Sequence, residues 1–172
     1  MDRLSAPERS SLIYLGDERS QLDSWLTFYR ETLLMKCDGL DIEQMKQRPI
    51  PSSKLSLLGL VRHMTFVEQT WFERIFAGIE RPRYYKDEPA SDGDFDDLNS
   101  AGLGEVLSNY GHVIEVSTAC AQGHGLDEVS ATPWRGREVD LRWIYLHMFE
   151  EYARHCGHAD LVRELVDGAT GY

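Results

Sequence analysis

The sequence predicts an all-α fold, a four-helix bundle with a long crossover between helices 2 and 3. In four long stretches apolar residues recur every three or four positions, and little of the chain shows the strict alternation of a half-buried strand. The polar segment 79–101 is too long for a tight turn and is typical of a crossover connection. A crossover of this length permits the two helices that it joins to run parallel.

The first helix is expected over residues 17–37, and Gly39 is expected to stop it. Steps of three and four residues align apolar side chains on one face of this helix, namely Leu22, Trp25, Leu26, Tyr29 and Leu33. This face predicts one side of the core.

The second helix is expected over residues 55–76, after Pro49 and Pro51 have interrupted any earlier helix. Ser52 or Ser53 would cap its first turn, because a serine hydroxyl accepts a hydrogen bond from the free backbone N–H groups there. Its apolar face consists of Leu57, Leu60, Met64, Val67, Trp71 and Ile75.

The third helix is expected over residues 103–121, with an apolar face that consists of Val106, Tyr110, Val113 and Val116. Residues 128–138 contain Pro133 and Gly136 and are expected to form a turn or a strand-like strap.

The fourth helix has the strongest pattern, over residues 140–167, with Asp140 near its start and Gly168 just after its end. Two oppositely charged pairs spaced four residues apart support its outer face, Glu150 with Arg154 and Arg163 with Asp167.

The composition indicates one globular domain over residues 1–172. The hydrophobic fraction is 42% and the charged fraction 27%, as in folded proteins. A net charge of −11 argues against nucleic acid and anionic membranes as partners. There is no apolar run long enough to span a bilayer and no hydrophobic signal segment, so a soluble, cytoplasmic protein is expected. Three widely spaced cysteines fit reduced thiols.

Three polar side chains interrupt the apolar helix faces. His63 lies three residues after Leu60 and four before Val67, which puts it on the buried face of the second helix. Glu151 and His155 are four residues apart in the fourth helix and therefore project from the same side. A facing pair of helices would bring the three together.

Such a cluster predicts a metal site. A carboxylate on a core face is costly unless a charge or a metal compensates it, and no lysine or arginine shares the stripe of Glu151. Two imidazoles and one carboxylate form a common zinc ligand set with one open position, and the same set suits Fe(II), Ni(II) or Mn(II). The alternative is that these side chains only hydrogen-bond to one another within the core.

Four further residues are candidates near this cluster. His147, four residues before the carboxylate, is expected either as a fourth ligand or as a group that supports the ligands. His158, three residues after His155, either orients that ring or lies on the surface. Trp134 and Arg135 either line the mouth of a pocket or pin a loop.

Two other features are given a structural interpretation. The acidic run Asp92, Asp94, Asp96 and Asp97 lacks the glycine and the glutamate that a calcium loop needs, so a solvated loop is expected. Cys156 adjoins a candidate ligand but points about 100° away from it on a helix. We expect it to be a small buried residue rather than a nucleophile.

Two segments resemble a known superfamily. LLGLVRHMTFVEQTWF (57–72) and LRWIYLHMFEEYARHCGHADLVRELVDGATG (141–171) are similar to the signature segments of the DinB-like, YfiT-like metalloenzymes. The branch that they resemble most is that of the mycothiol-dependent transferases. The resemblance covers nearly the whole chain, because the first helix, the crossover and the third helix also correspond.

The resemblance implies a four-helix bundle that holds one divalent metal, with His63, Glu151 and His155 at the ligand positions. Many members carry histidine where this chain has Glu151, and the glutamate version resembles the maleylpyruvate isomerase branch. That departure lowers the net charge of the site and leaves the identity of the metal open.

The resemblance also implies a divalent-metal-dependent transferase that uses a low-molecular-weight thiol, such as mycothiol, on small electrophilic substrates. Bacillithiol or glutathione would replace mycothiol in a host that lacks it. The alternatives are a metal-dependent hydrolase and a non-catalytic metal-binding helical protein. Apolar positions on the first and third helices would allow a homodimer.

Overall fold

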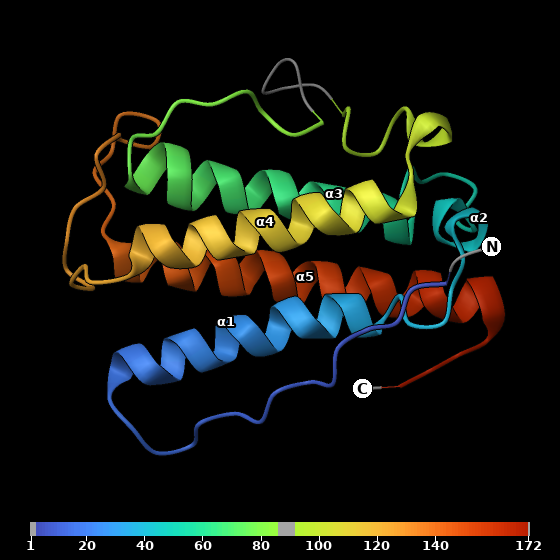
Figure 1. Ribbon diagram of the computed structural model, residues 1–172, viewed down its shortest axis with the longest axis horizontal. Coiled ribbons are helices and arrows are strands. Elements are labelled where there is room, and N and C mark those ends of the chain that lie inside the picture. Colours follow the sequence, from blue (N-terminus) through green and yellow to red (C-terminus); the bar gives the residue numbers. More distant parts are fainter. Residues whose placement is uncertain (1–2, 86–91, 172) are drawn as a thin grey trace.

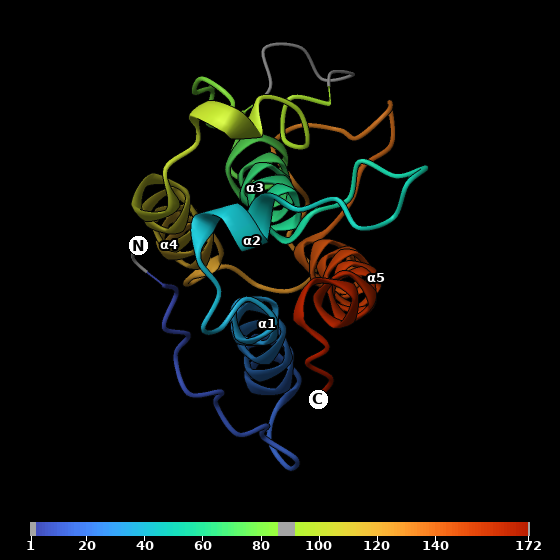
Figure 2. The ribbon, with the colours of Figure 1, turned by 90° about the vertical axis from the view of Figure 1, so that its right-hand side faces the viewer.

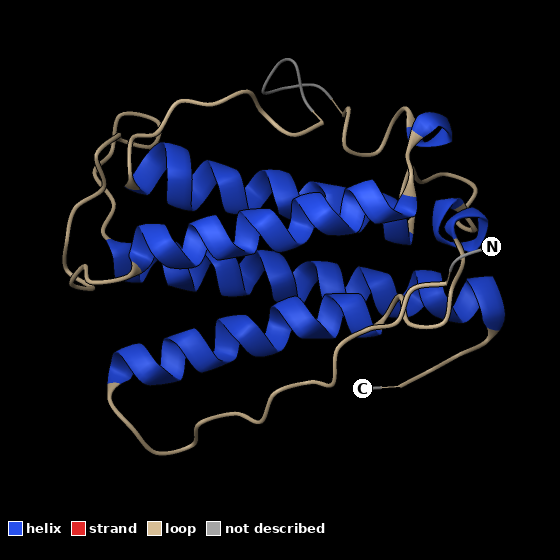
Figure 3. Cartoon of the chain, viewed as in Figure 1, coloured by secondary structure: helices blue, strands red, loops and turns tan. Residues whose placement is uncertain are grey.

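The protein is all-α in the computed structural model, which describes residues 3–85 and 92–171. Its helices are α1 (Glu18–Met35), α2 (Ile42–Lys46), α3 (Leu57–Glu68), the π-helix η1 (Gln69–Phe76), the 3₁₀ helix η2 (Leu98–Ser100), α4 (Leu103–Ala121) and α5 (Leu141–Asp167). Within those residues only isolated β-bridges occur and no strand forms (Figure 3). The prediction of an all-α fold is confirmed.

Four long helices lie side by side. In Figure 1, α1 and α5 run in one direction, while α3 with its continuation η1 and α4 run in the other. The end-on view of Figure 2 shows these four helices around a common centre. The crossover therefore joins parallel neighbours, α3 and α4, as its length permits. No helix in the described ranges is long and apolar enough to cross a membrane.

The helix ends follow the predicted signals closely except at the start of α3. Asp140 caps α5 by accepting a hydrogen bond from the backbone of Trp143 at 2.8 Å, and Gly168 ends it with a φ of 78°. The prediction of Ser52 or Ser53 as the cap of α3 is wrong. Ser56 caps that helix, because its hydroxyl accepts from the backbone N–H of Gly59.

The short helix α2 was not predicted from the apolar spacing. It spans five residues, too few for a periodic pattern, and a capping box holds its first turn. In this box the Asp41 carboxylate accepts from the backbone N–H of Gln44, and the Gln44 side chain accepts from that of Asp41. This pair of side chains was the available sequence signal.

A buried ion pair crosses the centre of the bundle. Arg30 on α1 donates two hydrogen bonds to the Glu68 carboxylate on α3, each of 2.7 Å. Glu68 is fully buried and Arg30 nearly so. Burial opposes the charge of Arg30, but the attraction of Glu68 outweighs it and raises the pKa of the guanidinium.

Two tyrosines complete this network. Tyr152 on α5 donates a hydrogen bond of 2.8 Å to Glu68, and its oxygen lies 3.0 Å from that of Tyr110 on α4. The pKa of each phenol is raised, mainly by burial, so both stay neutral and can act as donors. All four long helices therefore contribute a side chain to one polar network inside the core.

Replacing Glu68 with Gln is expected to lower the free energy of unfolding by about 3–5 kcal/mol, because the charge of Arg30 would remain buried without its counter-ion. Chemical denaturation followed by circular dichroism measures this change. Arg154→Gln, which removes an exposed pair with Glu150, is the control and is expected to cost less than about 1 kcal/mol. Equal losses in the two variants would contradict the assigned role of the buried pair.

Candidate metal centre

His63, Glu151 and His155 come together between α3 and α5. Each offers one potential ligand atom, and these three atoms lie within 4.8 Å of one another. The side chains are mostly buried, with exposed fractions of 18%, 16% and 11%. The four-residue spacing in α5 puts Glu151 and His155 on one face, and α3 presents His63 to that face.

The carboxylate of Glu151 lies between histidines. One of its oxygens is 3.3 Å from Nε2 of His155, and the other is 3.4 Å from Nε2 of His147. The hydrogen bond with His155 lowers the pKa of the Glu151 carboxyl and outweighs burial, which acts in the opposite direction. A deprotonated carboxylate at this position is the form that binds a cation.

The orientation of His63 is set by Asp94, which is fully buried. Nδ1 of His63 lies 2.6 Å from a carboxylate oxygen of Asp94. A carboxylate that accepts from one imidazole nitrogen leaves the other free as a ligand, an arrangement common around protein-bound metals. The prediction of a solvated acidic loop is therefore wrong at Asp94, although Asp92 and Asp96 pair with Lys54 at the surface.

The loop that carries Asp94 is packed tightly against α3. A Cβ on Gly59 would lie 2.6 Å from the ring of Phe95, so only glycine allows this approach. Arg62 donates hydrogen bonds to the backbone oxygens of Gly93 and Asp96. Gly59, one turn before His63, was the sequence signal that a segment packs closely on this face.

His155 is oriented by a second histidine. Nδ1 of His158 lies 3.3 Å from Nδ1 of His155, while Nε2 of His155 faces Glu151. With its hydrogen on Nδ1, a neutral His155 would donate to Nδ1 of His158, which leaves Nε2 of His155 without a hydrogen and able to bind a cation. Of the two alternatives for His158, the structure favours the one in which it orients His155.

His147 lies beside the cluster rather than in it. It belongs to a second group of potential ligands with Glu150 and Glu151, not to the set that contains His63. Its ring stacks on Trp143, with ring centroids 5.2 Å apart, and also contacts Trp71. Burial lowers the pKa of His147, which favours a neutral ring. These contacts favour a supporting role over that of a fourth ligand.

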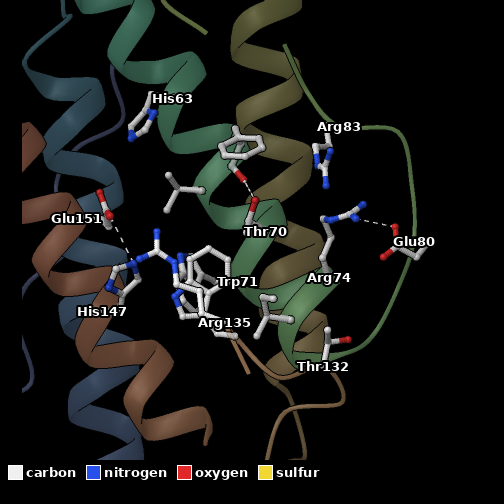
Figure 4. A pocket seen from close by; sticks show the side chains of 14 residues that line it. His63, Thr70, Trp71, Arg74, Glu80, Arg83, Thr132, Arg135, His147 and Glu151 are labelled. Atoms are coloured by element: carbon white, nitrogen blue, oxygen red, sulfur yellow. Dashed lines mark hydrogen bonds and ion pairs between the residues drawn. The ribbon is translucent and has the colours of Figure 1, made fainter. Parts of the chain in front are cut away.

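A cavity of about 530 Å³ opens beside the cluster (Figure 4). Its walls include His63, Glu151 and His147, while His155 lies outside the lining. The remaining lining residues come from α3, η1, the start of the crossover and the loop before α5: Phe66, Val67, Thr70, Trp71, Arg74, Ile75, Glu80, Arg83, Thr132, Trp134 and Arg135. Of the alternatives for Trp134 and Arg135, the structure supports the pocket.

The π-helix η1 supplies much of the pocket wall. It carries Thr70, Trp71, Arg74 and Ile75 into the lining. Such wide turns are frequent at functional sites. Apolar spacing predicted an uninterrupted α-helix to residue 76, because the pattern alone does not distinguish the two kinds of turn.

Cys156 is buried as expected. Burial raises the pKa of its thiol to about 12, so it carries little thiolate at neutral pH. All three cysteines are free, and Cys37 is buried in the same way. The buried thiols of Cys37 and Cys156 are therefore poor nucleophiles.

The fold and the site define a class, that of helical-bundle proteins with a histidine–carboxylate cluster beside a pocket. A profile of the family described as mycothiol-S-transferase matches residues 21–168. This match covers most of the chain, and the protein belongs to that family. Comparisons with curated proteins and with solved structures gave no match.

Asp94→Asn is expected to lower the affinity for Zn²⁺ by about 10–100-fold, because the amide is a weaker acceptor for the Nδ1 proton of His63. Competition with a chromophoric chelator measures this affinity. Asp92→Asn, which changes a surface carboxylate of the same loop, is the control and should leave the affinity unchanged. Equal affinities of Asp94→Asn and the unmodified protein would exclude the role given to Asp94.

Proposed function

We propose that this protein transfers mycothiol, a low-molecular-weight thiol, to small electrophilic substrates, with a divalent cation held by His63, Glu151 and His155. The observation that carries the proposal is the convergence of three ligand atoms within 4.8 Å at the wall of a cavity, in a member of the mycothiol-S-transferase family. Zinc is the metal that this donor set favours, and Fe(II), Ni(II) or Mn(II) would also bind it.

The donor set fits a cation on its own chemistry. Two neutral imidazoles and one carboxylate leave a net positive site when a divalent cation binds, which suits an anionic sulfur ligand. A bound divalent cation supplies a Lewis acid that lowers the pKa of a thiol and favours the thiolate. Asp94 and His158 hold the imidazole rings in the orientation that this binding needs.

The side chains around the cavity have complementary roles. Trp71, Trp134 and Val67 provide apolar surface that keeps water away from the reacting thiol. His63 and Glu151 reach the cavity directly, so a substrate there would lie beside the proposed cation. With thiols as cosubstrates, we place the protein in the reducing cytoplasm.

Elemental analysis of protein purified without an affinity tag is expected to find about one divalent cation per chain. His63→Ala is expected to lose most of it, because two donors remain and metal sites of this type need at least three. His112→Ala, which removes an exposed histidine of α4, is the matched control and should keep the metal. Equal metal content in the two variants would argue against the site.

Thiol consumption tests the reaction itself. With mycothiol and monochlorobimane, the protein is expected to consume thiol at least about 100-fold faster than its chelator-treated form, because the thiolate would be lost with the metal. Restoring Zn²⁺ should restore the rate. Hydrolysis of a substrate without thiol would favour the hydrolase alternative, and metal binding without turnover of any kind would favour a non-catalytic protein.

A further inference from the structure

Cationic side chains gather in the cavity of a strongly acidic protein. The chain carries 29 acidic and 18 basic residues, yet three arginines line this cavity: Arg74, Arg83 and Arg135. The carboxylates in the lining are those of Glu80 and Glu151. Since Glu151 belongs to the proposed metal centre, Glu80 alone among the lining residues remains to balance three guanidinium groups.

The three arginines differ in how far they are neutralised. Arg74 pairs with Glu80 at 2.7 Å, but the Glu80 side chain is 76% exposed and free to move away. Arg83 is half-buried, and no carboxylate of residues 3–85 or 92–171 lies within ion-pair distance of it. Arg135 is exposed at the rim, with its guanidinium 5.2 Å from the ring centroid of Trp134.

The cavity separates these cations from the proposed metal centre. Figure 4 shows Arg74 and Arg83 on the opposite side of the cavity from His63 and Glu151. Apolar side chains of Val67, Trp71 and Ile75 lie in the lining as well. A ligand that spans the cavity would therefore meet the proposed metal centre at one end and two guanidinium groups at the other. Between the two ends it would contact the apolar wall.

We propose that Arg74 and Arg83 form a binding site for a carboxylate group of the electrophilic substrate. A guanidinium group matches the two oxygens of a carboxylate, and partial burial strengthens the pairing. The substrate class is an electrophile whose reactive carbon and carboxylate are joined by a flat apolar body. The reaction of this substrate rests on the proposed function, whereas the binding of its carboxylate does not.

Two probes of nearly the same shape, one anionic and one neutral, test the binding. In calorimetric titrations without thiol, 4-chloro-3-nitrobenzoate is expected to bind at least about tenfold more tightly than 4-chloro-3-nitrobenzamide, as expected for one charge-assisted pair. Arg83→Gln is expected to abolish that preference by weakening benzoate binding alone. Glu80→Gln is expected to tighten benzoate binding, because it removes the competing carboxylate from Arg74.

Arg81→Gln is the matched control. It removes the same charge two residues away, from a side chain that is not in the cavity lining. Its affinity for the benzoate should stay within about twofold of that of the unmodified protein. This result would separate a direct contact with the carboxylate from the long-range electrostatic effect of a charge on the same loop. Thermal melts followed by circular dichroism confirm that each variant is folded.

The proposal is overturned if the two probes bind equally, if Arg83→Gln weakens both alike, or if it weakens mycothiol binding instead of benzoate binding.

The reaction is followed separately. The thiol sulfur forms a bond to the ring carbon, chloride leaves with the electrons of the C–Cl bond, and the thiol proton passes to solvent. Selective benzoate binding without this reaction would retain the carboxylate site and reject the transferase. Equal rates of reaction with both probes would retain the transferase and reject the carboxylate site.

Discussion

The buried ion pair between Arg30 and Glu68 is the interaction on which the geometry of the site depends. Glu68 lies at the end of α3, five residues after His63, and Tyr152, the neighbour of Glu151, donates a hydrogen bond to it. Arg30 ties the same carboxylate to α1. A buried charge tolerates little displacement of its partner, because each lost hydrogen bond leaves a desolvated group. The network therefore restricts how α3 and α5 can shift against each other.

The pairing of Glu151 with His155 was predictable because it depends on local spacing, and the family resemblance implied that His63 joins the pair. The four-residue step from Glu151 to His155 defines one face of a helix whatever the rest of the chain does. The position of His63 among apolar residues likewise determined that it faces the core. Regular helices carry such information in the order of their residues, and α4 and α5 have nearly the predicted bounds for the same reason.

Asp94 could not be predicted from the sequence, because its role depends on a long-range contact. It lies in an acidic, glycine-containing segment whose composition indicates solvent exposure, yet the packing of Phe95 on Gly59 brings it to His63. The pairing of Arg30 with Glu68 is also distant in sequence. Nor does residue spacing reveal the π-helix that aims Arg74 into the cavity, since both kinds of helix bury a similar stripe.

We propose that two histidines on facing helices, His63 and His155, bind one cation through Nε2. Nitrogen-15 NMR of histidine-labelled protein, recorded before and after addition of one equivalent of Zn²⁺, tests it most directly. We expect large shifts at Nε2 of His63 and His155, retention of a proton at Nδ1 of His63, and no change at the exposed His112 and His124. Unchanged resonances of His63 and His155, or equal responses from all four rings, would contradict it.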